Sequence, residues 1–269
     1  MHWLVVLVIL SELTKIIKMK KIVRNYLKIV NEFINTQSPF DFEILDTIIY
    51  NKIGYSFISL HTHSKLAKYN VVINSGAHGT ESIGVRVMLR FLQEFNKELL
   101  GYYNFQLFPI VNPYGYVYAT RRNGLGQYGN NGFNQKREED LTLEGKLIRD
   151  NIPHKIDLFI DIHADSDKNG FYIYERKRPN QKSLAENSLK ELRKNKISIL
   201  EAGTVYYEKC LNGVVIQPIK DGSMDNSMFD RGAIYSLCLE IPGKNSEDEQ
   251  IIGGLLLLNS ILKNYKDLI

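Results

Sequence analysis

Residues 71–96 read VVINSGAHGTESIGVRVMLRFLQEFN, and this stretch decides the fold. Its start, residues 71–74, is a short apolar run typical of a buried strand, and the glycine and polar residues that follow mark a turn. From residue 82 the apolar residues recur at helical spacing, namely at Ile83, Val87, Phe91 and Phe95. That spacing predicts a helix over residues 82–96. A buried strand that turns directly into an amphipathic helix is a building unit of α/β proteins.

The alternation of strands and helices continues on both sides of this stretch. Further strand patterns cover residues 43–50, 55–62, 105–111, 156–162, 171–174 and 234–241, and further helical patterns cover residues 141–151, 183–195 and 247–265. The first two of these strands form a hairpin. Near-continuous apolar strands between helices predict a three-layer α/β/α fold with a mixed, mostly parallel sheet. Ligands bind beyond the carboxyl ends of such strands, so the polar residues there are the candidate site.

Composition limits the class of protein without naming a function. The chain has 269 residues, 44% of them hydrophobic and 24% charged, which excludes a disordered protein and a coiled coil. Its net charge of +4 is mild, and no dense basic patch indicates a nucleic acid partner. Two cysteines cannot form a disulfide framework, so we expect a reducing, cytoplasmic environment.

The N-terminus carries an apolar run, WLVVLVIL, at residues 3–10. The run is far shorter than the roughly 20 residues of a membrane span, and it lacks the flanks of a secretory signal. We therefore expect no stable membrane insertion. Residues 1–18 are either an extension or misassigned start before Met19, or a helix packed on the domain. Residues 19–269 are expected to form a single catalytic domain.

Polar residues with metal-ligand chemistry follow the strand at residues 71–74. His78 and Glu81 are three residues apart at the strand-to-helix turn, so an imidazole nitrogen and a carboxylate can reach one ion. Taken alone the pair is also explained as an ordinary helix start with an acid in its first turn.

Two further apolar strands end in costly polar residues. The strand at residues 156–162 contains Asp161 near its end and is followed by His163. Because side chains alternate along a strand, Asp161 and His163 lie on the same side, and burying them there is costly unless they have partners. His163 is the third ligand candidate, and Asp161 would hydrogen-bond it from behind. Glu240 lies within the apolar strand at residues 234–241, where burial of a carboxylate costs free energy. Its presence there indicates either a general base or an ion pair with an arginine.

The ordered set of these motifs resembles the zinc carboxypeptidase family, the carboxypeptidase A-like (M14) metallopeptidases and their bacterial relatives. The resemblance spans about residues 70–262 and includes Asn-Pro-x-Gly at residues 112–115, the following arginines and Asn134. It implies one Zn²⁺ per chain, held by His78, Glu81 and His163. It also implies roles for three further residues: Glu240 as general base, Arg122 as the oxyanion arginine and Met224 as a wall of the side-chain pocket.

The chain departs from the family at the substrate carboxylate. The family has Asn-Arg where this chain has Asn134 and Gln135, so the arginine that clamps a terminal carboxylate is missing. Either Arg121 or Arg137 replaces it from another position, or the substrate lacks a simple free C-terminal carboxylate. The family's mobile tyrosine also has no counterpart just before Gly222.

We therefore expect a zinc-dependent hydrolase of the metallocarboxypeptidase type, which cleaves a peptide or amide bond by attack of a zinc-bound water. One alternative is a zinc amidohydrolase of the succinylglutamate desuccinylase or aspartoacylase type. The other is an inactive binding protein that retains zinc. Met224 favours an apolar pocket and poor activity on substrates that end in Lys or Arg.

Overall fold

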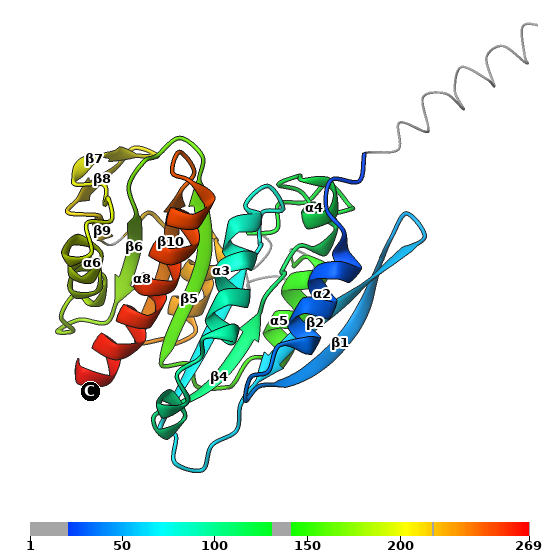
Figure 1. Ribbon diagram of the computed structural model, residues 1–269, viewed down its shortest axis with the longest axis horizontal. Helices are drawn as coiled ribbons and strands as arrows, with labels where there is room; N and C mark the ends of the chain where they lie inside the picture. Colours follow the sequence, from blue (N-terminus) through cyan, green and yellow to red (C-terminus); the bar gives the residue numbers. More distant parts are fainter. Residues whose placement is uncertain (1–20, 131–140, 217, 269) are drawn as a thin grey trace, which may run out of the picture.

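All ten strands among the described residues join one sheet, in the order β1-β2-β4-β3-β5-β10-β6-β9-β8-β7 (Figure 1). The computed structural model describes residues 21–130, 141–216 and 218–268. The strands are β1 (Asp41–Tyr50), β2 (Ile53–His61), β3 (Tyr69–Ser75), β4 (Tyr103–Phe108), β5 (Leu158–Asp165), β6 (Tyr172–Lys177), β7 (Ala202–Val205), β8 (Glu208–Leu211), β9 (Val214–Ile216) and β10 (Tyr235–Pro242). The α-helices are α2 (Tyr26–Asn35), α3 (Ser82–Gln93), α4 (Pro113–Tyr118), α5 (Leu143–Asn151), α6 (Leu184–Lys194), α7 (Met224–Asp230) and α8 (Glu247–Leu268), with a 3₁₀ turn η1 at Lys97–Gly101.

The parallel strands lie at the centre of the sheet. β3 pairs in parallel with β4 and β5, and β5 pairs in parallel with β10. The flanks are largely antiparallel. On one side, β2 pairs in antiparallel fashion with β1 and with β4. On the other side, the pairs β10–β6, β9–β8 and β8–β7 are antiparallel, and β6 and β9 run in parallel. The predicted mixed sheet is thus confirmed, and its parallel part is the four central strands.

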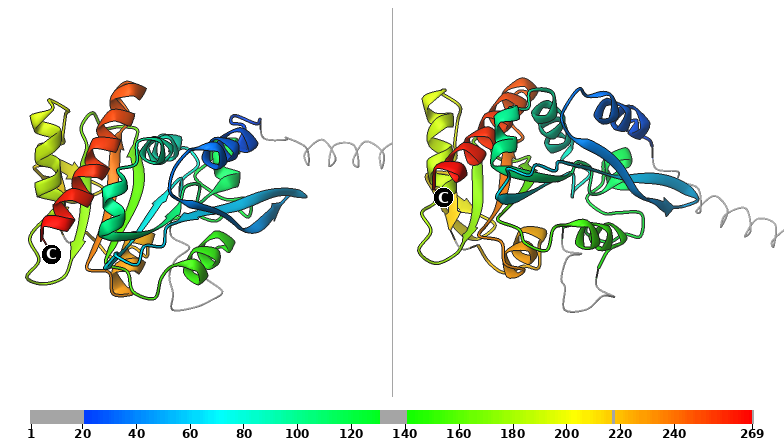
Figure 2. Two further views of the ribbon diagram at one scale, coloured as in Figure 1. Left: turned by 60° about the horizontal axis from the view of Figure 1, so that its bottom comes forward. Right: turned by 90° about the horizontal axis from the view of Figure 1, so that it is seen from below.

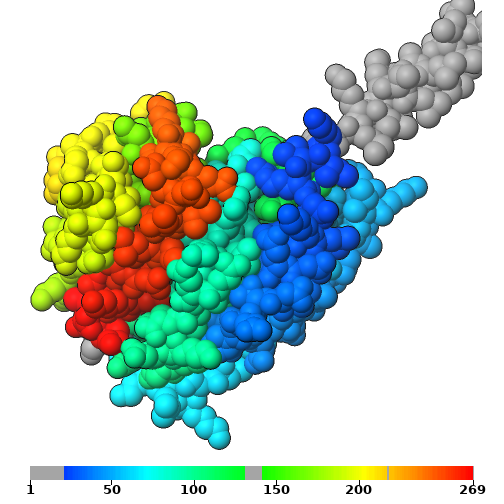
Figure 3. Space-filling model, viewed as in Figure 1, coloured from blue at the N-terminus to red at the C-terminus, as the bar shows by residue number. Residues whose placement is uncertain are grey.

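Helices cover both faces of the sheet, as in the predicted α/β/α fold. Figure 2 shows α2, α3, α6 and α8 along one face and α5 and α7 along the other. On the first face α8, α3 and α2 lie side by side and hide the strands beneath them (Figure 3). Because helices shield both faces, the central strands can be apolar on both sides.

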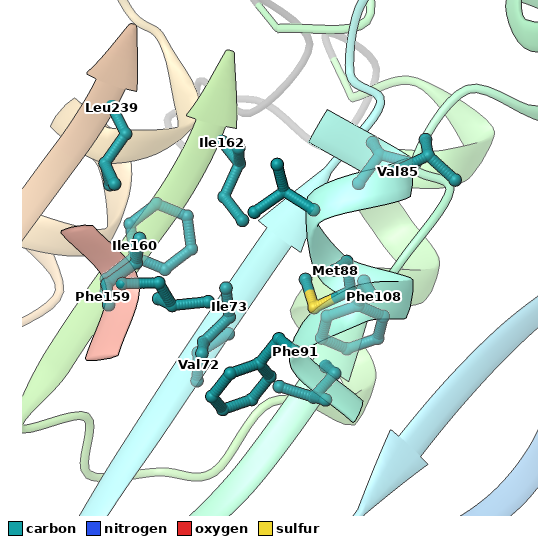
Figure 4. Packing of buried hydrophobic residues seen from close by; sticks show 14 of the residues in the cluster. Val72, Ile73, Val85, Met88, Phe91, Phe108, Phe159, Ile160, Ile162 and Leu239 are labelled. Carbon is teal, nitrogen blue, oxygen red and sulfur yellow. The ribbon is translucent and has the colours of Figure 1, made fainter. Parts of the chain in front are cut away.

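The hydrophobic core is densest where α3 packs on the central strands. Val85, Met88 and Phe91 of α3 are buried against the apolar residues of β3, β4 and β5 (Figure 4). Gly84 brings the helix close to the sheet, since a Cβ there would lie 2.8 Å from the carbonyl oxygen of Ile162. Each large apolar side chain buried here contributes about 1.5–3 kcal/mol. This packing fixes the start of α3, and with it the turn that precedes the helix.

Two parts of the fold were not expected from the sequence. Residues 113–118 form the short helix α4, and Asn112 caps its first turn by accepting a hydrogen bond from Gly115 N at 2.7 Å. The sheet also extends through β7, β8 and β9, three strands of four residues or fewer that no pattern indicated. The helix or extension considered for residues 1–18 lies outside the described residues. Within them, no helix is long and apolar enough to cross a membrane.

Candidate metal centre and active site

His78 and Glu81 occupy the connection from β3 to α3. The chain turns there through Gly76, which has a φ of +69°, and through Gly79. A Cβ at Gly79 would lie 1.8 Å from the carbonyl carbon of Gly115, so only glycine fits between the two segments. The tight turn places His78 and Glu81 at the carboxyl end of β3, beside the end of its parallel neighbour β5.

His163, at the end of β5, joins His78 and Glu81 in a three-residue group that we call the metal group. The Nδ1 atom of His78 lies 2.8 Å from Oε1 of Glu81, and the Nδ1 atom of His163 lies 2.9 Å from Oε2 of Glu81. One ligand atom from each residue fits within 4.8 Å of the others, and all three side chains are buried. Two imidazole nitrogens and a carboxylate that converge in this way are a donor set suited to Zn²⁺. The residues therefore fit the ion that the sequence implied.

The charges of this group are mutually dependent. Burial opposes ionisation of Glu81, but hydrogen bonds from His163 and His78 outweigh it and hold the pKa of the carboxyl well below its usual range. Burial lowers the pKa of His78, against the hydrogen bond with Glu81. Burial also disfavours the charged form of His163, but the carboxylates of Asp161 and Glu81 raise its pKa well above the usual value. A carboxylate that stays ionised at neutral pH is ready to bind a cation.

Asp161 lies behind His163, as its position two residues earlier on the strand predicts. Its Oδ2 atom is 3.1 Å from Nε2 of His163, which is close enough for an ion pair. The angle between the two groups does not meet the geometry of a hydrogen bond. Both oxygens of Asp161 are buried and have no hydrogen-bond partner among the described residues. A carboxylate in this place favours a proton on Nε2, so in the neutral form of His163 Nδ1 is the atom that can bind a metal.

Glu240 faces the same group from β10. In the parallel pairing of β10 with β5, Glu240 is the register partner of His163. Burial raises the pKa of Glu240 to about 8, opposed by the nearby His163. The thiol of Cys238 lies 3.8 Å from its Oε1 atom. A carboxylate with a pKa near neutrality beside a metal group is suited to accept and return a proton.

The two neighbouring arginines point in different directions. Arg121 contacts the group directly, with Nη1 2.9 Å from Oε1 of Glu81 and Nη2 3.2 Å from Nε2 of His78. Arg122 instead donates to the carbonyl oxygen of Gly126 at 2.6 Å and stacks on the ring of Tyr128. The structure therefore does not bring Arg122 to the oxyanion position expected for it, and the arginine beside the group is Arg121.

A cavity of about 390 Å³ opens over the group. His78, Glu81, Arg121, His163 and Glu240 line one end, and Arg176, Glu208, Ile219, Asp221 and Asp225 line the other. Met224, the expected pocket wall, is wholly buried and is not among the lining residues. Its sulfur instead accepts a hydrogen bond from Nδ2 of the buried Asn74. The sequence suggested an apolar pocket wall at Met224. The cavity in the structure is instead lined largely by polar and charged side chains.

A second cavity, of about 670 Å³, lies on the other side of the group. It shares Glu81, Arg121, Ala164 and Tyr206 with the first cavity. Tyr206 is part of the two-residue turn between β7 and β8, where Tyr206 and Tyr207 both have positive φ angles. Such a turn normally takes asparagine and glycine, so a bulky residue there carries strain. Tyr206 is therefore one of the residues that line both cavities.

Sequence reasoning missed Arg176, Glu208, Asp225 and this role of Tyr206. Arg176 and Glu208 lie on short strands, and Asp225 follows Met224 in α7. The one available signal was the charge of Arg176 next to the apolar pattern of β6. The predicted substrate residues Asn134, Gln135 and Arg137 lie outside the described residues.

Comparison with protein families agrees with the resemblance read from the sequence. The family model described as zinc carboxypeptidase matches residues 50–141. A search of curated protein sequences found no match. The matched segment includes His78, Glu81 and Arg121, and ends before His163 and Glu240.

Solved structures share the fold over most of the chain. A protein of Shewanella amazonensis SB2B described as a candidate metallopeptidase is 22% identical, with a TM-score of 0.74, 88% of this chain and 91% of that chain covered. A metallo-carboxypeptidase of Pseudomonas aeruginosa, solved with (2-guanidinoethylmercapto)succinic acid, is 16% identical, with a TM-score of 0.68 and coverage of 91% and 69%. Bovine thrombin-activatable fibrinolysis inhibitor, solved with tick carboxypeptidase inhibitor, is 16% identical, with a TM-score of 0.60 and coverage of 90% and 96%. The resemblance is confirmed, and the findings support a zinc carboxypeptidase-like hydrolase.

Proposed function

We propose that this chain is a zinc-dependent hydrolase that cleaves a peptide bond in the manner of a metallocarboxypeptidase. The observation that carries the proposal is the convergence of His78, Glu81 and His163 within 4.8 Å, beside Glu240 and at the end of a cavity. When bound there, Zn²⁺ would supply Lewis acidity, which lowers the pKa of water and polarises a carbonyl group.

The side chains around the group then have separate tasks. Glu240 accepts the proton of the attacking water at a carboxylate oxygen and returns it to the leaving amine. Burial raises the pKa of Glu240, which makes its carboxylate a stronger base than that of an exposed glutamate. Asp161 holds His163 in one orientation.

Arg121 replaces Arg122 as the proposed oxyanion arginine. Its guanidinium is half-exposed at the mouth of the cavity and already lies against Glu81 and His78. A fixed cation at that place stabilises negative charge that develops on the carbonyl oxygen of the substrate. Because Arg121 has this task, it is not the replacement for the missing carboxylate clamp.

The test measures hydrolysis of a panel of N-acylated dipeptides and N-acyl amino acids by the zinc-loaded and the chelator-treated protein. We expect zinc-dependent release of the C-terminal amino acid from the dipeptides. Cleavage confined to the N-acyl amino acids would indicate the amidohydrolase alternative. Binding of peptides without cleavage would indicate an inactive zinc-retaining protein.

A further inference from the structure

Residues 76–81, which carry His78 and Glu81, form a turn that packs against the short helix α4, and we call this segment the metal turn. The contact is closest at Gly79, between the two ligands. A Cβ at Gly79 would lie 1.8 Å from the carbonyl carbon and 2.0 Å from the carbonyl oxygen of Gly115. The position of α4 therefore limits where the backbone between the two ligands can lie.

Arg24 joins the metal turn to α4. Its Nη1 atom donates to the carbonyl oxygen of Gly79 at 2.8 Å and to that of Tyr116, in α4, at 2.9 Å. Each Nη atom of a guanidinium carries two hydrogens, so one atom can donate to both carbonyl oxygens at once. Hydrogen bonds from a charged donor are about twice as strong as those between neutral groups. The guanidinium thus bridges two backbone segments that lie 55 and 92 residues away from it in the sequence.

The backbone of Arg24 is itself fixed on the end of α4, where the chain passes before α2 begins (Figure 1). The N–H groups of Val23 and Arg24 donate to the carbonyl oxygen of Val117 at 2.9 and 3.1 Å. The last carbonyl groups of a helix have no partner within the helix, and here residues 23 and 24 supply partners for those of Tyr116 and Val117. The guanidinium also lies over the ring of Tyr116, 5.4 Å from its centroid. Because its backbone and side chain are both held, Arg24 is a fixed support for the metal turn.

The support acts on the most adaptable part of the metal turn. Gly79 has no side chain to restrict its φ and ψ angles. The N–H group of Glu81 donates to the carbonyl oxygen of His78 at 3.0 Å within the turn, whereas the carbonyl oxygen of Gly79 accepts its hydrogen bond from outside, from Arg24. Without that bond, other conformations of the turn would compete with the one that brings both ligands to an ion. The affinity for the ion falls by the fraction of molecules that leave the competent conformation.

We propose that Arg24 is a positioning residue for the metal group and acts on zinc binding through the carbonyl oxygen of Gly79. The inference rests on the metal site of the proposed function and is independent of the substrate. Arg24 lines neither of the two cavities beside the metal group, which separates its role from that of residues that contact substrate.

The test compares the zinc affinity of Arg24→Ala with that of Tyr26→Phe, measured by competition with a chromophoric chelator. Tyr26→Phe is the matched control, because the hydroxyl of Tyr26 also ties α2 to the protein but donates to the carbonyl oxygen of Ser56 in β2. We expect the zinc Kd of Arg24→Ala to rise by about tenfold or more, the usual loss for groups that orient metal ligands. The Kd of Tyr26→Phe should change by less than about twofold. Thermal unfolding of the zinc-free variants measures what each substitution costs in stability, so that a loss of affinity is separated from a loss of folding.

Two further measurements keep the test decisive. Co²⁺ in place of zinc reports the ligand geometry through its visible absorption bands, which should change in Arg24→Ala and stay as in the wild type in Tyr26→Phe. Arg24→Lys keeps the charge but loses the planar guanidinium, so its zinc Kd should lie between those of the wild type and Arg24→Ala, about threefold or more above the wild type. This variant carries the comparison if Arg24→Ala does not fold.

The outcomes separate this inference from the proposed function. Zinc affinity and Co²⁺ spectra in the Arg24 variants equal to those of Tyr26→Phe would overturn the inference and leave the proposed function intact. Weaker zinc binding by the Arg24 variants, in a protein whose wild type cleaves no peptide, would support the inference and reject the hydrolase alone. Failure of the wild type to bind zinc would reject both.

Discussion

The two ends of the cavity differ in how they are built. The metal end lies on the carboxyl ends of β3, β5 and β10, three adjacent parallel strands at the centre of the sheet. The far end is formed by β6, β8, α7 and the loop between β9 and α7, which meet through side-chain contacts at the antiparallel flank. The first arrangement is set by the register of core strands, and the second depends on charged contacts such as Arg176 with Asp225.

From this difference we expect the metal end to carry out the reaction and the far end to determine which substrate binds. A rigid centre holds ligands in fixed geometry, because each ligand strand packs on both faces. Loops and short strands can change sequence without disturbing that centre. Changes at the metal end should therefore abolish the reaction, whereas changes at the far end should alter which substrate is used.

The largest expected effect is that of His163→Ala. Removal of one of three protein ligands leaves a poorly held ion, so the variant should lose most of its zinc and its zinc-dependent activity with it. Elemental analysis after dialysis measures the metal, and Asp225→Asn at the other end of the cavity serves as the control for zinc content. Full stoichiometric zinc in the His163 variant would show that the group is not the metal site.

The next effect is that of Glu240→Gln, which keeps the shape of the side chain but cannot accept a proton. Zinc content should stay at the wild-type level, while kcat falls by about 10²–10⁴-fold, the usual contribution of a general base. Single-turnover kinetics on one peptide measures the loss. Activity close to that of the wild type would make Glu240 a structural residue.

The central fold and the metal group were readable from the sequence for a physical reason. Placing His163 at the end of an apolar strand and Glu240 inside another costs desolvation free energy. A bonding partner or a role in metal binding or catalysis accounts for that cost. The parallel order of the strands then brings those residues to one edge. By contrast, β7 and β8 have mostly exposed residues and only four residues each, so no period is visible in them.

The choice between Arg121 and Arg122 was beyond sequence reasoning. The loop that carries them is fixed by Asn123, whose side chain donates to the buried Glu144 at 3.1 Å. Glu144 in turn accepts a hydrogen bond from Tyr50 on β1. These partners lie 21 and 94 residues away from Asn123 and Glu144 respectively, so no local pattern reveals which arginine faces the metal group.

A matched pair of variants sharpens that assignment. Arg121→Ala should lower kcat/KM by about 10²-fold, as expected for removal of a group that stabilises an oxyanion. Arg122→Ala removes a hydrogen bond to Gly126 and a contact with Tyr128 on the surface, so we expect a change below about threefold. Steady-state kinetics on one peptide compares the two. A loss in Arg122→Ala as large as that in Arg121→Ala would reverse the assignment.

The smallest expected effect concerns Tyr206, which lines both cavities. Partial burial of the phenol, together with the carboxylates of Asp165 and Glu240, raises its pKa, although Tyr206 as a whole is 67% exposed. The hydroxyl is therefore protonated at neutral pH and can donate a hydrogen bond. Its neighbour Tyr207 is 98% exposed and lines neither cavity, although it belongs to the same strained turn. The pair therefore offers a substitution at the site and a matched substitution beside it.

Tyr206→Phe should raise KM about three- to tenfold, the value of one hydrogen bond to the substrate, with little change in zinc content. Tyr207→Phe should leave KM unchanged, because its hydroxyl faces solvent. The measurement is a full KM and kcat determination for both variants on a peptide long enough to occupy both cavities. Because phenylalanine keeps the ring and the backbone strain, a loss confined to Tyr206→Phe isolates the hydroxyl itself. Equal KM values in the two variants would mean that Tyr206 only covers the site, and that substrates cross the metal group without contacting its hydroxyl.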